Sequence, residues 1–254
     1  GGNAPITVEG TALIGATEIM GMALVLDAVN QKFGIDAPEK ISGFAVTGVL
    51  DMKTLQGVFS SPEAILQDMM IAEMFKELYH AKIFFNPDYT DAKLPGIQAV
   101  YERMMKYMAC VHMGESWYVE NFSCGNLQTC TIHSNTQMMI DLELGRGLHK
   151  YFARKQTIGM DDILAEVKDV LSQEEHTFML TDMTIENFKD NFYSFFVDRS
   201  AWTDVLYAKH EEEIMNEANN RYKKLLTSYV APELDVARAK EVEKIIKAAE
   251  SALL

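Results

Sequence analysis

The residues best suited to chemistry lie in three polar loops, each near the carboxyl end of a segment expected to form a β-strand. The loops contain charged, hydroxyl and amide side chains, at 51–54, 88–93 and 120–133. In parallel α/β folds, the loops at the carboxyl ends of the strands meet on one face, and chemistry gathers there. The placement predicts a site for a small polar substrate. The alternative is a set of solvated loops that cap the helices that follow them.

Asp91 and Lys93 are the leading candidate pair, at the entry to a helix expected to begin near Pro95. As a functional pair, the carboxylate would hold a cationic group while the lysine orients a substrate carboxylate. Alternatively, Asp91 is an N-terminal charge or cap of that helix. Asp51, in the first loop, is a further candidate for substrate binding.

The third loop and the segment before it add three candidates for substrate binding, Tyr118, Glu120 and His133. Trp117, Tyr118 and Phe122 could form an aromatic wall, and such walls bind a trimethylammonium group through cation–π attraction. The alternative is that these aromatic side chains pack in an ordinary core.

Thiols and imidazoles in the same region suggest a zinc site, at Cys110, His112, Cys124, Cys130 and His133. Their spacings match no standard structural site, in which paired ligands stand roughly two to four residues apart. Buried thiols and a hydrogen-bonded histidine explain the pattern more simply. The sequence therefore predicts no metal ligands.

The elements that would position these loops alternate between strand and helix. Strands are expected over 41–46, 82–85 and 117–122, and helices over 11–32, 61–80, 95–112 and 136–153. The short links favour parallel βαβ units over an antiparallel sheet. Further along, helices are expected over 160–172, 202–229 and 232–254, with a mixed segment at 181–193.

Composition excludes several classes of partner. The 254 residues are 48% hydrophobic, enough for one large α/β domain. The 23 basic residues against 37 acidic ones give a formal net charge of −14, which argues against nucleic acid or an anionic membrane surface. The odd number of cysteines favours a reducing cytoplasm over a disulfide framework. No apolar run approaches the length of a membrane span, so no membrane segment is expected.

Several segments resemble, in order, segments of the trimethylamine methyltransferase family, which also contains glycine betaine demethylases. The stretch 90–102, Thr-Asp-Ala-Lys-Leu-Pro-Gly-Ile-Gln-Ala-Val-Tyr-Glu, is similar to the family's TDSKLPDAQAGYE. The other matching segments are 2–11 with GATAPVTLAGT, 50–54 with MDMRT, 57–63 with YGSPE, 140–143 with VLDDE, and 197–199 with LLDR. The resemblance carries over Asp91 and Lys93 as the matched site loop, and Asp51 as a further candidate.

The resemblance implies an α/β fold, a (β/α)₈ TIM barrel of which this chain is the C-terminal part. The domain boundaries it implies are 1–200 for the barrel and 201–254 for a C-terminal helical extension. Earlier barrel strands and N-terminal helices would be missing, which accounts for the small number of expected strands.

The resemblance also implies a reaction. Family members take a methyl group from a quaternary or tertiary amine and pass it to the cobalt of a corrinoid, a cobalamin-type cofactor, on a separate small protein. The implied partners are a corrinoid protein and a small methylated amine, with no corrinoid bound tightly to this chain. A quaternary amine is preferred, because its nitrogen is already a leaving group and the sequence displays no pyrrolysine.

The chain departs from the family where substrate contacts are expected. Residues 115–122 replace a Gly-rich stretch, Met183 stands in place of the histidine of a late HTL segment, and Gly96 replaces an aspartate. Two alternatives therefore stay open, a non-catalytic binding or scaffold fragment of the barrel, and a zinc-dependent cobalamin/thiol methyltransferase. Because an incomplete barrel exposes strand edges and apolar faces, we expect a homo-oligomer or association with a missing N-terminal half.

Overall fold

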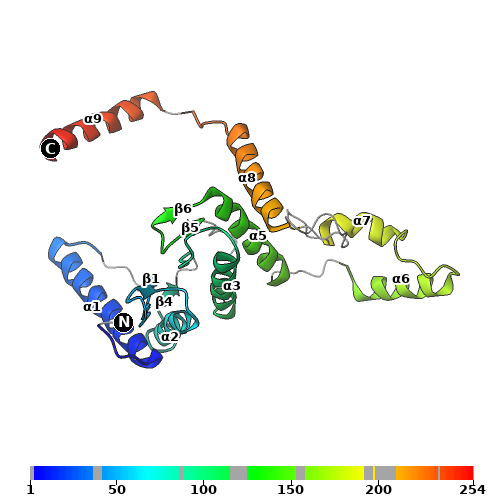
Figure 1. The fold of residues 1–254 in the computed structure, drawn as a ribbon, viewed down its shortest axis with the longest axis horizontal. Helices are drawn as coiled ribbons and strands as arrows, with labels where there is room; N and C mark the ends of the chain where they lie inside the picture. Colours follow the sequence, from blue (N-terminus) through cyan, green and yellow to red (C-terminus); the bar gives the residue numbers. More distant parts are fainter. Residues whose placement is uncertain are drawn as a thin grey trace.

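The computed structural model describes residues 3–36, 42–85, 88–114, 125–152, 158–191, 197, 210–233 and 235–253. This part of the chain is mostly helical, with three small two-stranded sheets (Figure 1). The helix-and-sheet content is consistent with the expected α/β class. The described strands do not close into a barrel.

A parallel pair of strands lies at the centre of the N-terminal region. Strands β1 (Ser42–Ala45) and β4 (Lys82–Phe85) are hydrogen-bonded neighbours, with Ser42 opposite Lys82 and Ala45 opposite Phe85. Helix α2 (Pro62–Tyr79) connects them and packs on the pair. This crossover confirms the βαβ unit expected from the sequence, and it places the carboxyl ends of both strands at the same edge.

Helix α2 begins and ends where its local sequence predicts. The Ser61 hydroxyl accepts a hydrogen bond from the Ala64 amide at 3.3 Å, and Pro62 occupies the first helical turn, where its missing N–H costs nothing. His80 ends the helix in the left-handed conformation, with φ 50°. The buried side of α2 supplies Ile71 and Phe75 to a core shared with α1, β1 and β4.

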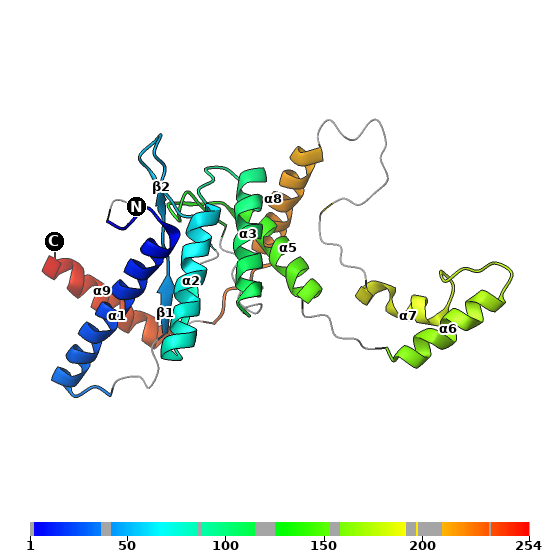
Figure 2. The ribbon, with the colours of Figure 1, turned by 90° about the horizontal axis from the view of Figure 1, so that it is seen from below.

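Helix α1 (Val8–Phe33) packs along α2 and extends beyond it (Figure 2). The contact is close, since a Cβ added at Gly15 would lie 2.7 Å from Ile71 Cδ1. Most other apolar side chains of α1 are exposed. By length and composition α1 could cross a membrane, which corrects the expectation that no segment comes near a span. A single such helix is weak evidence for a membrane-spanning segment, because core helices of soluble proteins and signal sequences meet the same criterion.

Two short antiparallel hairpins interrupt the helical chain, and neither was expected. The first joins β2 (Val49–Leu50) to β3 (Gly57–Val58), and the second joins β5 (Asn126–Leu127) to β6 (Ile132–His133). The expected strand at 117–122 lies outside the described residues.

The remaining helices largely follow the sequence prediction. They are α3 (Ile97–His112), α5 (Asn135–Phe152), α6 (Met160–Ser172), α7 (Asp182–Asn191), α8 (His210–Ser228) and α9 (Val236–Leu253). Helix α5 packs against α3 and α8, while α6 and α7 lie apart from this group in both views (Figures 1 and 2). The site therefore has to be sought among β1, β4, α2, α3, α5 and the hairpins.

Candidate functional site

Two of the three loops named from the sequence, 88–93 and 120–133, meet at Asp91, beyond the carboxyl end of β4, together with the residues that follow β3. The Asp91 carboxylate accepts hydrogen bonds from the Phe59 amide, at 3.1 and 3.2 Å to its two oxygens, and from the Ser60 amide at 2.9 Å. The hydroxyl of Thr129, in the turn of the β5–β6 hairpin, donates to the same carboxylate at 3.5 Å. Asp91 thus connects residues that follow β3, β4 and β5.

The β5–β6 turn is held against the loop after β4 by backbone hydrogen bonds. The Thr129 amide donates to the Thr90 carbonyl and the Gln128 amide to the Ala92 carbonyl, both at 2.8 Å. Gln128, Thr129 and Cys130 all have positive φ, an arrangement that is costly for non-glycine residues and needs such external support. The turn is therefore built to fit the Asp91 loop.

Asp91 is not a cap of the helix that follows it. Helix α3 begins at Ile97 with Gly96 as its N-cap, and no side chain bonds to that end. The Lys93 side chain is exposed, and its ammonium donates at 2.7 Å to the backbone carbonyl of Asp91 rather than to the carboxylate. The two residues are neighbours in space, but they do not form a carboxylate–ammonium pair.

Beneath this loop, Glu102 of α3 is buried and fully hydrogen-bonded. Its Oε2 accepts from the Thr90 hydroxyl at 2.5 Å and from the Asp91 amide at 2.7 Å, and its Oε1 accepts from the Gln98 amide group at 2.8 Å. Glu102 therefore fixes the backbone that presents the Asp91 carboxylate. Its role was not recognised from the sequence.

Arg103, the next residue of α3, is buried between two carboxylates from other elements. Its guanidinium lies 3.6 Å from an oxygen of Asp88, in the loop after β4, and 3.6 Å from Asp141 on α5. It also donates to the backbone carbonyl of Asn126 at 2.5 Å. Burial raises the pKa of Asp141, and the charge of Arg103 opposes that change. Arg103 thus ties α5 and the β5–β6 hairpin to the strand loop.

Lys106 lies one turn beyond Glu102 on the same helix and is 2% exposed. Its ammonium stands 5.5 Å from the centre of the Tyr89 ring. Burial lowers the pKa of Lys106 to about 8, an effect opposed by the charge of Asp68.

Asp68 of α2 completes the polar cluster and is 4% exposed. Its Oδ1 accepts from both the amide and the hydroxyl of Thr47, the second residue after β1, at 2.7 Å each. Burial raises the pKa of Asp68 to about 7, against the effect of these two hydrogen bonds. Near neutral pH, Asp68 and Lys106 can therefore each exchange a proton, which few buried groups do.

We use the name polar cluster for the charged groups gathered at this edge of the parallel pair. They are Asp68, Asp88, Asp91, Glu102, Arg103, Lys106 and Asp141. Its carboxylates outnumber its cations. A cluster with this excess can hold a cationic group, or it can take up and release protons.

Two other sequence candidates lie outside the polar cluster. Asp51 stabilises the turn between β2 and β3, because its carboxylate accepts from the Lys53 amide at 2.9 Å and the Thr54 hydroxyl at 2.8 Å. These hydrogen bonds lower the pKa of Asp51. His133 is exposed on β6 and pairs with the Asn135 side chain at 3.0 Å. Tyr118 and Glu120 lie outside the described residues.

The cysteines and histidines considered for zinc do not converge in the described part of the chain. Cys110 is buried in an apolar cluster with Tyr107 and Ile65, whereas Cys130 is exposed. Among the described residues, no three His, Cys, Asp or Glu side chains are placed to share a metal ion. Cys124 lies outside those residues.

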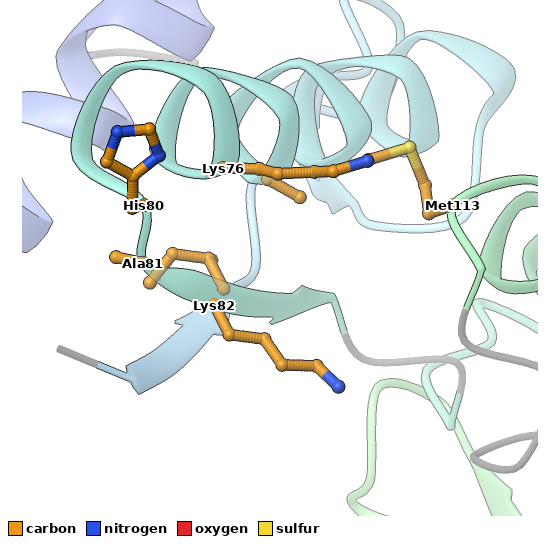
Figure 3. A pocket seen from close by; sticks show the side chains of 7 residues that line it. Lys76, His80, Ala81, Lys82 and Met113 are labelled. Atoms are coloured by element: carbon orange, nitrogen blue, oxygen red, sulfur yellow. The ribbon is translucent and has the colours of Figure 1, made fainter. Parts of the chain in front are cut away.

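A pocket of about 340 Å³ lies at the opposite end of β4 (Figure 3). Its lining comes from the end of α2, the start of β4 and the end of α3, with Lys76, His80 and Lys82 as its basic side chains. All three are exposed, and Lys82 extends away from the side where Lys76 and His80 lie. None of the residues of the polar cluster lines this pocket.

Comparison with known proteins gives two matches. The sequence model of the trimethylamine methyltransferase (MTTB) family matches residues 1–253. A glycine betaine methyltransferase from Desulfitobacterium hafniense (strain Y51) is 25% identical over 236 residues, which cover 92% of this chain and 47% of the relative. The chain thus spans about half the length of that relative.

Proposed function

Because this chain belongs to the trimethylamine methyltransferase family, we propose that it forms part of an enzyme that demethylates a quaternary or tertiary methylated amine. The acceptor is the cobalt of a corrinoid carried by a separate protein, in the cytoplasm. Residues 1–200 form the C-terminal part of a (β/α)₈ barrel, and residues 201–254 form a helical extension. The observation that carries the proposal is the polar cluster at the carboxyl edge of β1 and β4, where barrel enzymes place their chemistry.

The chain's own task in this reaction is to hold the amine. When a methyl group leaves a quaternary nitrogen, the nitrogen keeps the electron pair of the broken C–N bond, so no protein acid is needed. Buried carboxylates attract the cationic nitrogen and fix its orientation for in-line transfer. The corrinoid, when it is present, supplies the nucleophile that accepts the methyl group. The described residues offer buried carboxylates suited to the amine, and the family resemblance supports placing the corrinoid on the partner protein.

Asp91 contributes to this task by joining three loops, and Lys93 stands beside it at the surface. Asp51, Tyr118, Glu120 and His133 remain proposed substrate contacts. Asp51 and His133 would reach a substrate only if it extends beyond the polar cluster, since each contacts its own hairpin.

Calorimetric titration of the full chain with glycine betaine, proline betaine, carnitine and trimethylamine tests the proposal. We expect saturable binding of at least one compound, and a loss of about tenfold or more in affinity in Asp91→Asn and Glu120→Gln. Glu73→Gln, which removes an exposed carboxylate of α2, is the matched control and should bind as the unaltered chain does. Absence of binding by all four compounds would contradict the proposal.

A non-catalytic binding or scaffold fragment is the second candidate, favoured by the departures at Gly96 and Met183. Such a fragment would bind the amine or the corrinoid protein without transferring the methyl group. Binding in the titration combined with no methyl transfer to a corrinoid would support this second candidate. The zinc-dependent alternative has no ligand set among the described residues.

A further inference from the structure

Another pocket, of about 390 Å³, lies between helices α5 and α8, which pack side by side (Figure 1). Its volume falls within the roughly 300–1,000 Å³ of pockets that hold small molecules, and spaces between packed helices are common places for them. Residues spaced three or four apart line it from each helix, so two helix faces meet there. They include Met139, Leu142 and Arg146 on α5, and Arg221, Lys224 and Leu225 on α8.

This pocket and the polar cluster lie on different sides of α5. Asp141, which belongs to the polar cluster, is two residues from Met139, and side chains two apart on a helix do not face the same way. Gln137, one turn before Asp141, bonds to it at 2.8 Å and stands on the same side of the helix. The proposed amine site therefore leaves the pocket between α5 and α8 without a role.

A small core holds the two helices in place beside the pocket. Met139 is 2% exposed and forms a buried cluster with Ile140 and with Ala218 of α8. Met215 and Tyr222 of α8 pack against the same cluster. The facing side chains are therefore positioned before a ligand arrives, which lowers the cost of binding one.

The charged residues that line the pocket within the described part of the chain are all basic. Arg146, Arg221 and Lys224 contribute three positive charges, although the whole chain has a formal net charge of −14. Glu217 pairs with Arg221 at 2.9 Å and offsets one of these charges. The remaining lining is apolar apart from Ser228. A local excess of positive charge beside an apolar lining is complementary to an organic anion.

We propose that this pocket binds an organic anion, a carboxylate or a phosphate ester with an apolar body, as a ligand distinct from the methylated amine. The apolar body packs on Met139, Leu142 and Leu225, and the anionic group meets Arg146 and Lys224 from the two walls of the pocket. Guanidinium groups bind carboxylates and phosphates through paired, charge-assisted hydrogen bonds. The inference is independent of the proposed function, because it concerns a different side of α5.

An apolar pocket on α3 provides a contrast. It has a volume of about 520 Å³, and none of its described lining residues is charged: Val100, Tyr101, Met104, Met105 and Met108. A molecule that binds this chain through its apolar body alone would bind there as well. The charge of the ligand therefore separates the two pockets, and Met108→Gln alters the apolar one only.

The test compares ligands that share an apolar body and differ in charge. The full chain is titrated calorimetrically with octanoate, octyl phosphate and octanol. We expect saturable binding of octanoate or octyl phosphate, at least about tenfold tighter than that of octanol. The tighter of the two anions assigns the ligand as a carboxylate or a phosphate ester. Equal affinities for the anions and octanol, or no saturable binding of either anion, would overturn the proposal.

Two double variants locate the site. Arg146→Gln with Lys224→Gln removes two exposed charges of the pocket and should weaken binding of the tighter anion by about tenfold or more. Lys150→Gln with Lys223→Gln is the matched control, because it changes the net charge equally, at exposed residues of the same two helices that do not line the pocket.

The control double variant and Met108→Gln should each change the affinity for the tighter anion by less than about twofold. An equal loss in the two double variants would reveal a general effect of charge and overturn the proposal. A loss in Met108→Gln comparable to that in the Arg146 and Lys224 variant would overturn it too.

Asp91→Asn separates this pocket from the proposed amine site. The tighter anion should bind this variant as it binds the unaltered chain, whereas glycine betaine binding should weaken. A loss of anion binding in Asp91→Asn would place the anion at the polar cluster and overturn the inference. If glycine betaine does not bind the unaltered chain, the proposed function fails, while the anion titrations still decide this inference.

Discussion

Substituting Asp68 by asparagine tests the electrostatics of the polar cluster through the free energy of unfolding. Both hydrogen bonds from Thr47 end on the same oxygen, Oδ1, which an asparagine side chain can retain. The substitution therefore removes the ionisable group while it keeps the local hydrogen bonding. What changes is the cost of placing a carboxylate charge in a buried position.

The expected magnitude follows from the pKa of Asp68, which burial raises from 3.8 to about 7. An acid with a raised pKa binds a proton more readily in the folded state, so its contribution to stability is complete below pH 4 and is lost as the pH rises to 7. At about 1.4 kcal/mol per pH unit, the loss between these values is about 4 kcal/mol. Asp68→Asn removes this loss.

The assay is urea unfolding followed by far-ultraviolet circular dichroism, at intervals from pH 4 to pH 8. Relative to the unaltered chain, Asp68→Asn should gain stability steadily up to about pH 7 and then remain level. Glu73→Gln, on the exposed side of the same helix, is the control for general effects of charge. A difference that stays constant over this range, or that favours the unaltered chain as the pH rises, would refute the reasoning.

Three further substitutions test other contacts of the site. Burial lowers the pKa of Lys106 from 10.5 to about 8, so this lysine destabilises the folded chain as the pH falls from 10.5 to 8. Lys106→Met removes the ionisable group. The free energy of unfolding that Lys106→Met gains over the unaltered chain should therefore shrink as the pH rises from 8 to 10.5. Asp91→Ala leaves the Phe59 and Ser60 amides without their acceptor and should cost about 1–3 kcal/mol in urea unfolding. Arg103→Met leaves Asp88 and Asp141 without their shared cation and should lower the free energy of unfolding by about 3–5 kcal/mol. Arg221→Met, at a surface pair with Glu217, should lower it by about 1 kcal/mol or less. Equal costs for the two arginines would contradict the burial argument.

Elements with strong local signals were predictable from the sequence. Helix α2 carries its cap at Ser61 and a proline at the position that tolerates one, and β4 is a short apolar run between polar links. These signals depend on neighbouring residues alone, so they can be recognised without knowledge of the tertiary contacts. The expected parallel pairing is confirmed by β1 and β4. The loop at 51–54, however, is the turn of the β2–β3 hairpin and does not join Asp91.

The charged residues of α3 show where sequence reasoning stopped. Charges on a helix usually face solvent, yet Glu102, Arg103 and Lys106 are buried because their partners come from the strand loop, α2 and α5. The local sequence does not show which residues of other elements contact these three side chains. The available signal was the grouping of all three on one side of a helix otherwise rich in methionine and tyrosine, which is typical of a functional interior face.

The two hairpins were missed for a different reason. Their strands are two residues long, and their turns lack the asparagine–glycine or aspartate–glycine pairs that mark tight hairpins. The β5–β6 turn instead places Gln128, Thr129 and Cys130 in the left-handed region, supported by the loop after β4. Long-range packing, rather than local propensity, stabilises this turn.

Methyl transfer to free cob(I)alamin is the most direct test of the proposed function. The full chain is incubated with glycine betaine and reduced cobalamin in the absence of oxygen, and the absorbance change that accompanies methylcobalamin formation is followed over time. The account predicts amine-dependent formation of methylcobalamin that is abolished in Asp91→Asn and retained in Glu73→Gln. No methylcobalamin above the protein-free rate, with glycine betaine or trimethylamine, would contradict it.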